Sequence, residues 1–253
     1  MLRENDPIMS IRYVKEAPFK QFQKICFFGH VLEPITIAHL TQQSIIDHTK
    51  EIIKLYGPGY NYDREATIEL SNQAIQLLLE ASQLPDKASQ HTITFLQKQL
   101  YDVTKVESHN LSFSGPLKGI IREANFLHVA RFHAGLHVFN SPHLDMKHKV
   151  DFVLANETHC LGVNVKSTRF TTQDLLHTRT PVWKVGVDAL NIPTDTGVLY
   201  QFPFTKTEHY TFSTKILNQI SEGFQTTEAA KPLLLPPSDP SQSLDREQCY
   251  QLH

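Results

Sequence analysis

Apolar residues recur at helical spacing through much of the first half of the chain. Between Thr36 and about Leu55, isoleucine and leucine return every three or four residues, which is the spacing of one buried helix face. Asp63 predicts the N-cap of a second helix that ends before Pro85, and Asp86 predicts the cap of a third helix that runs to Tyr101. A short apolar run over 24–28 predicts one strand before these helices.

The pattern changes after the segment SFSGP at 112–116. Helical spacing predicts a helix over 117–134, and alternating apolar and polar residues predict strands after it. The later elements are strands over 136–139, 149–154, 160–166, 182–187 and 198–202, and helices over 172–177 and 213–223. This order predicts an α/β (α+β) protein with a helical N-terminal region (1–112), a mixed core (113–225) and a Pro- and Ser-rich, disordered tail (226–253).

The composition is that of a folded protein. The chain has 253 residues, of which 40% are hydrophobic and 20% are charged, and its net charge is −2. No apolar run approaches the ~20 residues of a membrane span, and the first ten residues lack the apolar stretch of a signal peptide. Three scattered cysteines are too few for a disulfide framework or a CxxC zinc site. We therefore expect a cytoplasmic protein with no membrane partner.

Charge is distributed unevenly along the chain. Residues 116–188 contain nine Lys and Arg against six acidic residues, a net charge of +3, whereas the remainder carries −5. Seven of the fourteen histidines also lie in this window. The near-neutral total therefore does not argue against a nucleic-acid partner, because a phosphate backbone would meet the basic segment.

The stretch from His148 to Ser167 carries the strongest chemical signal. Two short predicted strands flank a turn, and in the second strand the apolar residues Leu161, Val163 and Val165 alternate with Gly162, Asn164 and Lys166. A neighbouring strand in a hairpin would bring Asp151 to the polar face. A carboxylate, an amide oxygen and an ammonium group would then meet, and such a group suits Mg²⁺-assisted hydrolysis of a phosphodiester.

At these residues the chain resembles the PD-(D/E)XK nuclease superfamily. Asp151 matches the first acid of its motif, and Asn164-Val165-Lys166 match the acid-x-Lys element on the next strand. Lys149-Val150, Ser167-Thr168-Arg169 and the order of elements over 117–188 are also similar. The resemblance implies a restriction-endonuclease-like mixed β-sheet core flanked by helices, and a metal-dependent endonuclease that hydrolyses DNA.

The resemblance also implies roles for individual residues. Asp151, Asn164 and the Val165 carbonyl would hold Mg²⁺ (or Mn²⁺), and Lys166 would position the attacking water. Glu123, on the preceding helix, would be an accessory ligand or base. Phosphate contacts would come from Lys147, Lys149 and Arg169. The helical region would then serve target recognition or formation of a homodimer.

One departure from the family pattern is chemically important. Asn164 stands where the family has Asp, Glu or Gln, and its amide brings no negative charge, so the affinity for the metal should fall. A second hypothesis is therefore a non-catalytic nuclease-like module that binds nucleic acid or protein. A third is an ordinary amphipathic hairpin in which Asp151 and Lys166 form a surface ion pair worth ~0–1 kcal/mol.

A different resemblance lies near the N-terminus. GHVLEPITIAHL at 29–40 is similar to the first motif of nucleotidyltransferases of the HxGH type, with Thr36 and His39 at the motif positions. FSTKIL at 212–217 is similar to their second motif through Ser213 and Thr214. Ala38 stands in place of the motif glycine and Leu217 in place of an arginine. This family would need a parallel sheet, with a strand-to-helix turn that cradles phosphates.

Overall fold

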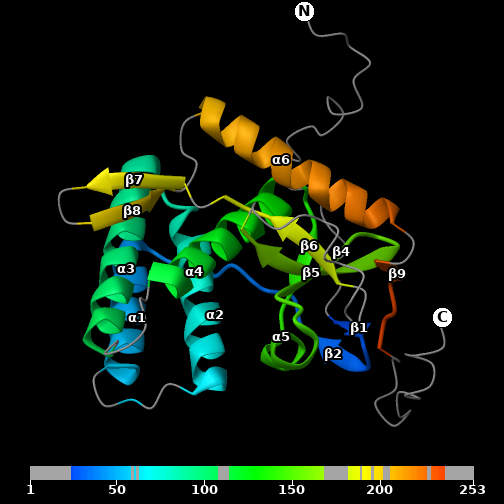
Figure 1. Ribbon diagram of the computed structural model, residues 1–253, viewed down its shortest axis with the longest axis horizontal. Helices are drawn as coiled ribbons and strands as arrows, with labels where there is room; N and C mark the ends of the chain where they lie inside the picture. The colour runs from blue at the N-terminus through cyan, green and yellow to red at the C-terminus, as the bar shows by residue number, and fades with distance from the viewer. Residues whose placement is uncertain are drawn as a thin grey trace, which may run out of the picture.

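The computed structural model describes residues 24–57, 60, 63–107, 114–167, 182–188, 190–194, 197–201, 206–226 and 229–236. Helices make up one side of the molecule and a mixed β-sheet with its covering elements makes up the other (Figure 1). Two features expected from the sequence, the helix over 172–177 and the phosphate contact of Arg169, lie outside the described residues. No helix in the described ranges has the length and apolar character needed to cross a membrane.

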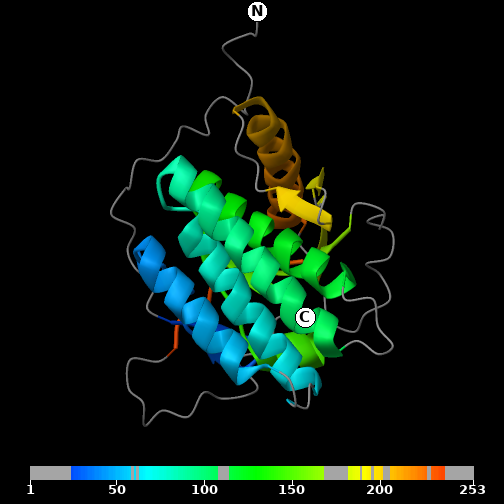
Figure 2. The same cartoon turned by 90° about the vertical axis from the view of Figure 1, so that its left-hand side faces the viewer.

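Four helices lie side by side in the helical part (Figure 2). They are α1 (Gln42–Leu55), α2 (Arg64–Ala81), α3 (Asp86–Glu107) and α4 (Ser114–His128), and a π-helical turn (Val129–His133) extends α4. Asp63 caps α2 as predicted, because its side chain accepts a hydrogen bond from the N–H of Ala66 at 2.8 Å.

The first helix begins later than its apolar pattern predicts. Thr41 caps α1, so the helix starts at Gln42 rather than near Thr36. The preceding segment is extended because its backbone bonds to the sheet: the N–H of Ile35 donates to the carbonyl of Val138 at 2.8 Å. A tertiary contact therefore overrides the local helical spacing.

The main sheet has five strands and mixed direction. Its strands are β3 (His137–Phe139), β4 (Phe152–Ala155), β5 (His159–Lys166), β6 (Trp183–Gly186) and β9 (Ala230–Pro232). The order is β3-β4-β5-β6, in which the first two pairings are antiparallel and the β5–β6 pairing is parallel, and β9 pairs antiparallel with the start of β5. The α/β (α+β) class is therefore confirmed.

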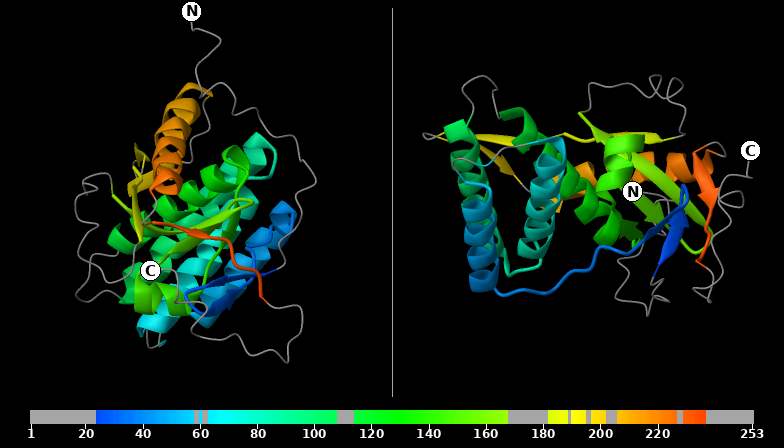
Figure 3. Two further views of the ribbon diagram at one scale, coloured as in Figure 1. Left: turned by 90° about the vertical axis from the view of Figure 1, so that its right-hand side faces the viewer. Right: turned by 90° about the horizontal axis from the view of Figure 1, so that it is seen from below.

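Both faces of this sheet are covered (Figure 3). The helix α6 (Lys206–Gln225) and α4 cover one face through the apolar positions Leu161, Val163 and Val165. The hairpin of β1 (Ile25–Phe27) and β2 (His30–Leu32), together with α5 (Pro142–His148), covers the other face. A further hairpin, β7 (Leu190–Thr194) and β8 (Gly197–Gln201), contacts α3.

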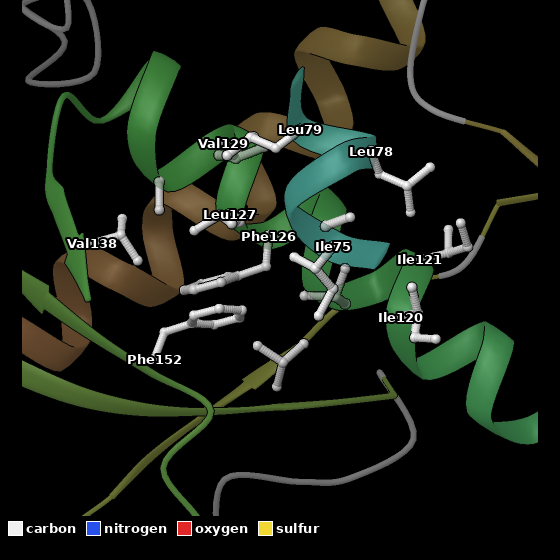
Figure 4. Close-up of a cluster of buried hydrophobic side chains, with 14 of the residues drawn as sticks. Ile75, Leu78, Leu79, Ile120, Ile121, Phe126, Leu127, Val129, Val138 and Phe152 are labelled. Carbon is white, nitrogen blue, oxygen red and sulfur yellow. The ribbon is translucent and has the colours of Figure 1, made fainter. Parts of the chain in front are cut away.

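The helices and the sheet share one hydrophobic core. A single cluster joins Ile75 and Leu78 of α2 to Phe126 of α4 and to Val138 and Phe152 of the sheet (Figure 4). The rings of Phe126 and Phe152 stack with centroids 5.9 Å apart. The N-terminal helices therefore stabilise the sheet directly by removing its apolar face from water.

Several short elements were not predicted from the sequence. They are β2, α5, β7 and β9. The region after 226, predicted to be a disordered tail, contains β9, and beyond it the N–H of Cys26 donates to the carbonyl of Leu234 at 2.8 Å. These segments are too short for a periodic pattern, and they depend on partners that are distant in sequence.

Candidate functional site

Asp151 lies at the point where β4 begins beside the end of β5. Its N–H donates to the Val163 carbonyl at 2.9 Å, and its Oδ2 accepts a hydrogen bond from the Val165 N–H at 2.6 Å. The Asp151 carboxylate therefore accepts the hydrogen bond that a backbone carbonyl of the neighbouring strand would otherwise accept from Val165. This local geometry is what brings the Asp151 side chain to the acid-x-Lys segment.

The Val165 carbonyl faces the same edge of β5 as the Val165 N–H. In an antiparallel pair, both backbone groups of a hydrogen-bonded residue point to the same neighbouring strand. Since the Val165 N–H points at Asp151, the Val165 carbonyl lies on the Asp151 side of the strand. Two oxygen donors of the kind that Mg²⁺ prefers are thus available at this edge.

Asn164 is nearly completely buried, with 5% of its surface exposed. Its Nδ2 donates to the Lys149 carbonyl at 2.5 Å and lies 3.5 Å from Oδ1 of Asp151. Its own Oδ1 is buried and has no hydrogen-bond partner. An unsatisfied buried oxygen costs ~1–3 kcal/mol, so a hydrogen-bond donor or a cation at this atom would stabilise the protein.

Glu123 of α4 joins this group from the helix side. Burial raises the pKa of the Glu123 carboxyl well above its usual value, and the charges of Asp151 and Asp145 raise it further. Burial likewise raises the pKa of Asp151, to about 7, while Lys166 opposes the shift. The site therefore brings together acidic groups whose pKa values are raised by burial and by one another's charge.

Asp145 is a third acid of the site, and the sequence alone does not single it out. It lies on α5, half-buried, and burial raises the pKa of its carboxyl, while the charges of Lys149, Arg64 and Lys166 lower it. Asp145 in turn raises the pKa of both Glu123 and Asp151. No signal in the sequence points to it, because α5 has seven residues and buries only Leu144.

Lys166 is the positive group common to these acids. Its charge lowers the pKa of Glu123, Asp145 and Asp151 alike, which places it within electrostatic reach of all three. The residue is half-buried at the end of β5. In the described part of the chain no direct ion pair joins Lys166 to Asp151, so the reading of these two residues as a surface ion pair is not supported.

The structure corrects one expectation for β5. The face of Gly162, Asn164 and Lys166 was predicted to be polar and outward, but the β1–β2 hairpin covers most of it. A Cβ atom on Gly162 would lie 2.9 Å from the ring of Phe27, so only glycine fits beneath the hairpin. The polar face opens only at its Lys166 end, where the residue is half-buried.

The predicted phosphate contacts lie on the outer side of the site. Lys147 and Lys149 are both exposed, at the C-terminal end of α5. Lys149 adopts a left-handed conformation with φ 58°, which ends the helix and turns the chain into Asp151. The α5 helix therefore carries Asp145 toward the site and lysines toward solvent.

The oxygen atoms around Asp151 are the groups that would hold a metal ion. In the ranges that the structure describes, no group of three or more His, Cys, Asp or Glu side chains is arranged to hold a metal ion. Mg²⁺, however, is usually bound by one or two carboxylates, with water and substrate oxygens completing its shell. Asp151, the Val165 carbonyl and Asn164 are the groups at this edge of β5 that would hold such an ion.

The N-terminal motif residues are arranged differently from what nucleotidyl transfer would need. Thr36 and His39 are exposed in the segment before α1, and β1 pairs antiparallel with β2 instead of leading into a helix of a parallel sheet. Ser213 is buried within α6, seven residues after its first residue Lys206, with Thr214 beside it. Neither residue lies at the helix N-terminus that would cradle phosphates.

Comparisons with protein-family models, with curated proteins and with solved structures found no match to this chain.

Proposed function

We propose that the protein is a metal-dependent endonuclease that hydrolyses phosphodiester bonds of DNA. The observation that carries the proposal is the meeting of Asp151, Asn164 and Lys166 on two adjacent strands, beside the buried Glu123 of α4. The arrangement of α4, β3, β4, β5 and a parallel β6 is also the order that the PD-(D/E)XK resemblance implies. Mg²⁺ or Mn²⁺ is the proposed cofactor.

In this proposal each residue of the site has a separate role. A bound divalent ion would polarise the phosphoryl group and lower the pKa of a bound water. Asp151, the Val165 carbonyl and Asn164 would bind that ion, while Lys166 orients the attacking water and offsets the charge that develops on the phosphate. Glu123 would serve as accessory ligand or base, because burial and the charge of Asp151 raise the pKa of its carboxyl and make it a stronger base.

The proposal is tested by a plasmid-nicking assay with Mg²⁺ or Mn²⁺. We expect Lys166→Ala and Asp151→Asn each to lower the cleavage rate by about a hundredfold or more, the loss seen when one transition-state donor is removed. Lys54→Ala, which removes an exposed lysine from α1, is the matched control and should cleave at the wild-type rate. Absence of metal-dependent cleavage by the wild-type protein on DNA and RNA would overturn the proposal.

A second candidate is a non-catalytic nuclease-like module that binds nucleic acid. The observation that favours it is Asn164 itself, because the amide lacks the charge of the family's acid and its Nδ2 is engaged with the Lys149 carbonyl at 2.5 Å. This candidate predicts salt-dependent DNA binding without cleavage, at any metal concentration.

A further inference from the structure

The turn between β1 and β2 lies beside α5 (Figures 1 and 3). Three histidines and two lysines belong to these two elements or directly follow them. They are His30, His143, His148, Lys147 and Lys149, which we call the histidine–lysine surface. His143, Lys147 and Lys149 are exposed, and His30 and His148 are half-buried. None of these histidines has a role in the proposed hydrolysis.

Ring contacts hold the two elements of this surface together. The rings of His30 and His143 lie with centroids 4.6 Å apart, and the ring of Phe28 stacks on His148 at 5.5 Å with an angle of 15° between the planes. Phe28 and Gly29 both have positive φ, 47° and 75°, and this tight turn directs the Phe28 ring toward α5. Histidines separated by more than a hundred residues are therefore kept at fixed positions.

The charges that face this surface are mainly positive. Arg64 of α2 approaches α5 and donates to the Met146 carbonyl at 3.4 Å. The acid of the β1–β2 hairpin, Glu33, lies at its opposite end and pairs with Lys24 at 2.9 Å. Asp145 is the acid of α5, and the positive charges of Lys149, Arg64 and Lys166 act on its carboxyl.

The positive charge of the surface depends on pH. Histidine is the side chain whose charge ordinarily changes between pH 5 and pH 8, so the positive charge of a surface that contains histidines rises as the pH falls. Burial lowers the pKa of His148, and the neighbouring charges of Lys147, His30 and His143 lower it further. A polyanion seated on the surface would relieve this repulsion and favour protonation of the rings.

We propose that the histidine–lysine surface binds the phosphate backbone of a nucleic acid beside the candidate site, and binds it more tightly at pH 5.5 than at pH 8. The choice of nucleic acid as the polyanion rests on the proposed function, because α5 carries both this surface and Asp145 of the site. Exposed cations beside aromatic and imidazole rings are the groups that contact phosphates and bases.

The test is binding of a fluorescent 20-base-pair DNA duplex in EDTA, followed by anisotropy across a salt series at pH 5.5 and pH 8. Each phosphate contact adds about 0.9 to the slope of log K against log salt, so three protonated histidines would steepen the slope by up to about 2.7 at pH 5.5. The triple variant His30→Gln/His143→Gln/His148→Gln should lose this pH dependence and bind at least about tenfold more weakly at pH 5.5.

The control variant removes histidines from two other helices. His48→Gln/His91→Gln changes exposed residues of α1 and α3 and should keep the wild-type pH dependence. If the triple variant does not fold, the single variant His143→Gln, at an exposed position, should lose part of the slope. Equal slopes at the two pH values, or equal losses in the triple and control variants, would overturn the proposal.

The test separates this inference from the proposed function. Binding in EDTA requires no cleavage. A pH-dependent affinity without nuclease activity would therefore refute the proposed endonuclease activity and support the proposed binding surface. Cleavage with a pH-independent affinity would refute the surface alone. Tighter binding to vesicles containing phosphatidylserine than to DNA would assign the surface to an anionic membrane and overturn the nucleic-acid proposal.

Discussion

At the scale of single residues, the site is defined by buried acids whose hydrogen bonds and neighbouring positive charges do not offset the cost of burying a carboxylate. Asp151 accepts one strong backbone hydrogen bond and lies near Lys166, yet burial still raises the pKa of its carboxyl to about 7. Asn164 places a buried oxygen without a partner beside it. Such a site lowers the stability of the folded protein in the absence of a ligand. Strongly shifted pKa values of this kind are common at binding and catalytic sites.

The first prediction concerns the pH dependence of stability. Because the folded pKa of Asp151, about 7, exceeds its ordinary value of 3.8, its contribution to stability is fully present below about pH 4 and is lost as the pH rises to about 7. Asp151→Asn should remove this loss, so the variant gains on the order of 2–4 kcal/mol relative to wild type between pH 4 and pH 8. Urea unfolding in EDTA measures it.

The control for that experiment is Glu51→Gln, which changes an exposed acid of α1. Its unfolding free energy should follow that of the wild-type protein across the same pH range. A free-energy difference between Asp151→Asn and wild type that stays constant with pH would contradict the prediction.

The second prediction concerns the missing charge at position 164. Asn164→Asp adds a carboxylate beside Asp151 and should strengthen Mn²⁺ or Mg²⁺ binding by about tenfold or more, measured by titration calorimetry. Without metal the variant should be less stable by about 1–3 kcal/mol, because a carboxylate cannot donate to the Lys149 carbonyl. Added metal should restore the melting temperature, and an unchanged metal affinity would exclude Asn164 from the ligand set.

At the scale of elements, close contacts between helix and sheet decide where the strands of the site lie. The helix α6 crosses β5 and β6 at Gly223, where a Cβ atom would lie 2.7 Å from Cδ2 of Leu161 and 2.8 Å from Cδ1 of Trp183. Trp183 also donates from Nε1 to the Gln219 carbonyl at 2.8 Å. The glycine is therefore required for close approach between helix and sheet, and not for a turn.

The third prediction follows from this contact. Gly223→Ala should destabilise the protein by about 1–3 kcal/mol, because the indole ring and the neighbouring leucine must move to admit one methyl group. Gly119→Ala in α4 is the matched control, since its Cβ atom would come no nearer than 4.0 Å to Oε1 of Glu123. The control should be stabilised by about 0.5–1 kcal/mol. Chemical denaturation distinguishes the two, and equal effects would contradict the prediction.

At the scale of the whole molecule, the shared core makes the helical region and the sheet one folding unit. Leu78 of α2 is completely buried in the cluster that also contains Phe152 of β4 (Figure 4). A substitution in the helices should therefore weaken the sheet as well. This arrangement means that the N-terminal helices set the position of α4, and with it the position of Glu123.

The fourth prediction tests this coupling. Trp183, the sole tryptophan, reports on the sheet, whereas far-ultraviolet circular dichroism reports mainly on the helices. The two signals should unfold in one coincident transition. Leu78→Ala should shift both by about 2–5 kcal/mol, and Leu55→Ala, at a position 67% exposed, should shift neither by more than about 0.5 kcal/mol. Separate transitions would show two independent units.

The sequence by itself determined the long helices, the main strands and the neighbourhood of Asp151 with Asn164 and Lys166. These features depend on local rules: helical spacing, an N-cap at Asp63, and alternation along β5 beside a strand close in sequence. Sequence patterns were therefore sufficient for the long helices, for the main strands and for the local part of the site.

Tertiary structure alone decided the rest. It placed Asp145 beside Asp151 through a helix too short to show a period, buried the expected polar face under Phe27, and joined β9 to β5 across about seventy residues. It also brought His30 to His143. The physical reason is the same in each case. The stabilising contacts form between residues that are distant along the chain, and a local sequence pattern does not predict such contacts.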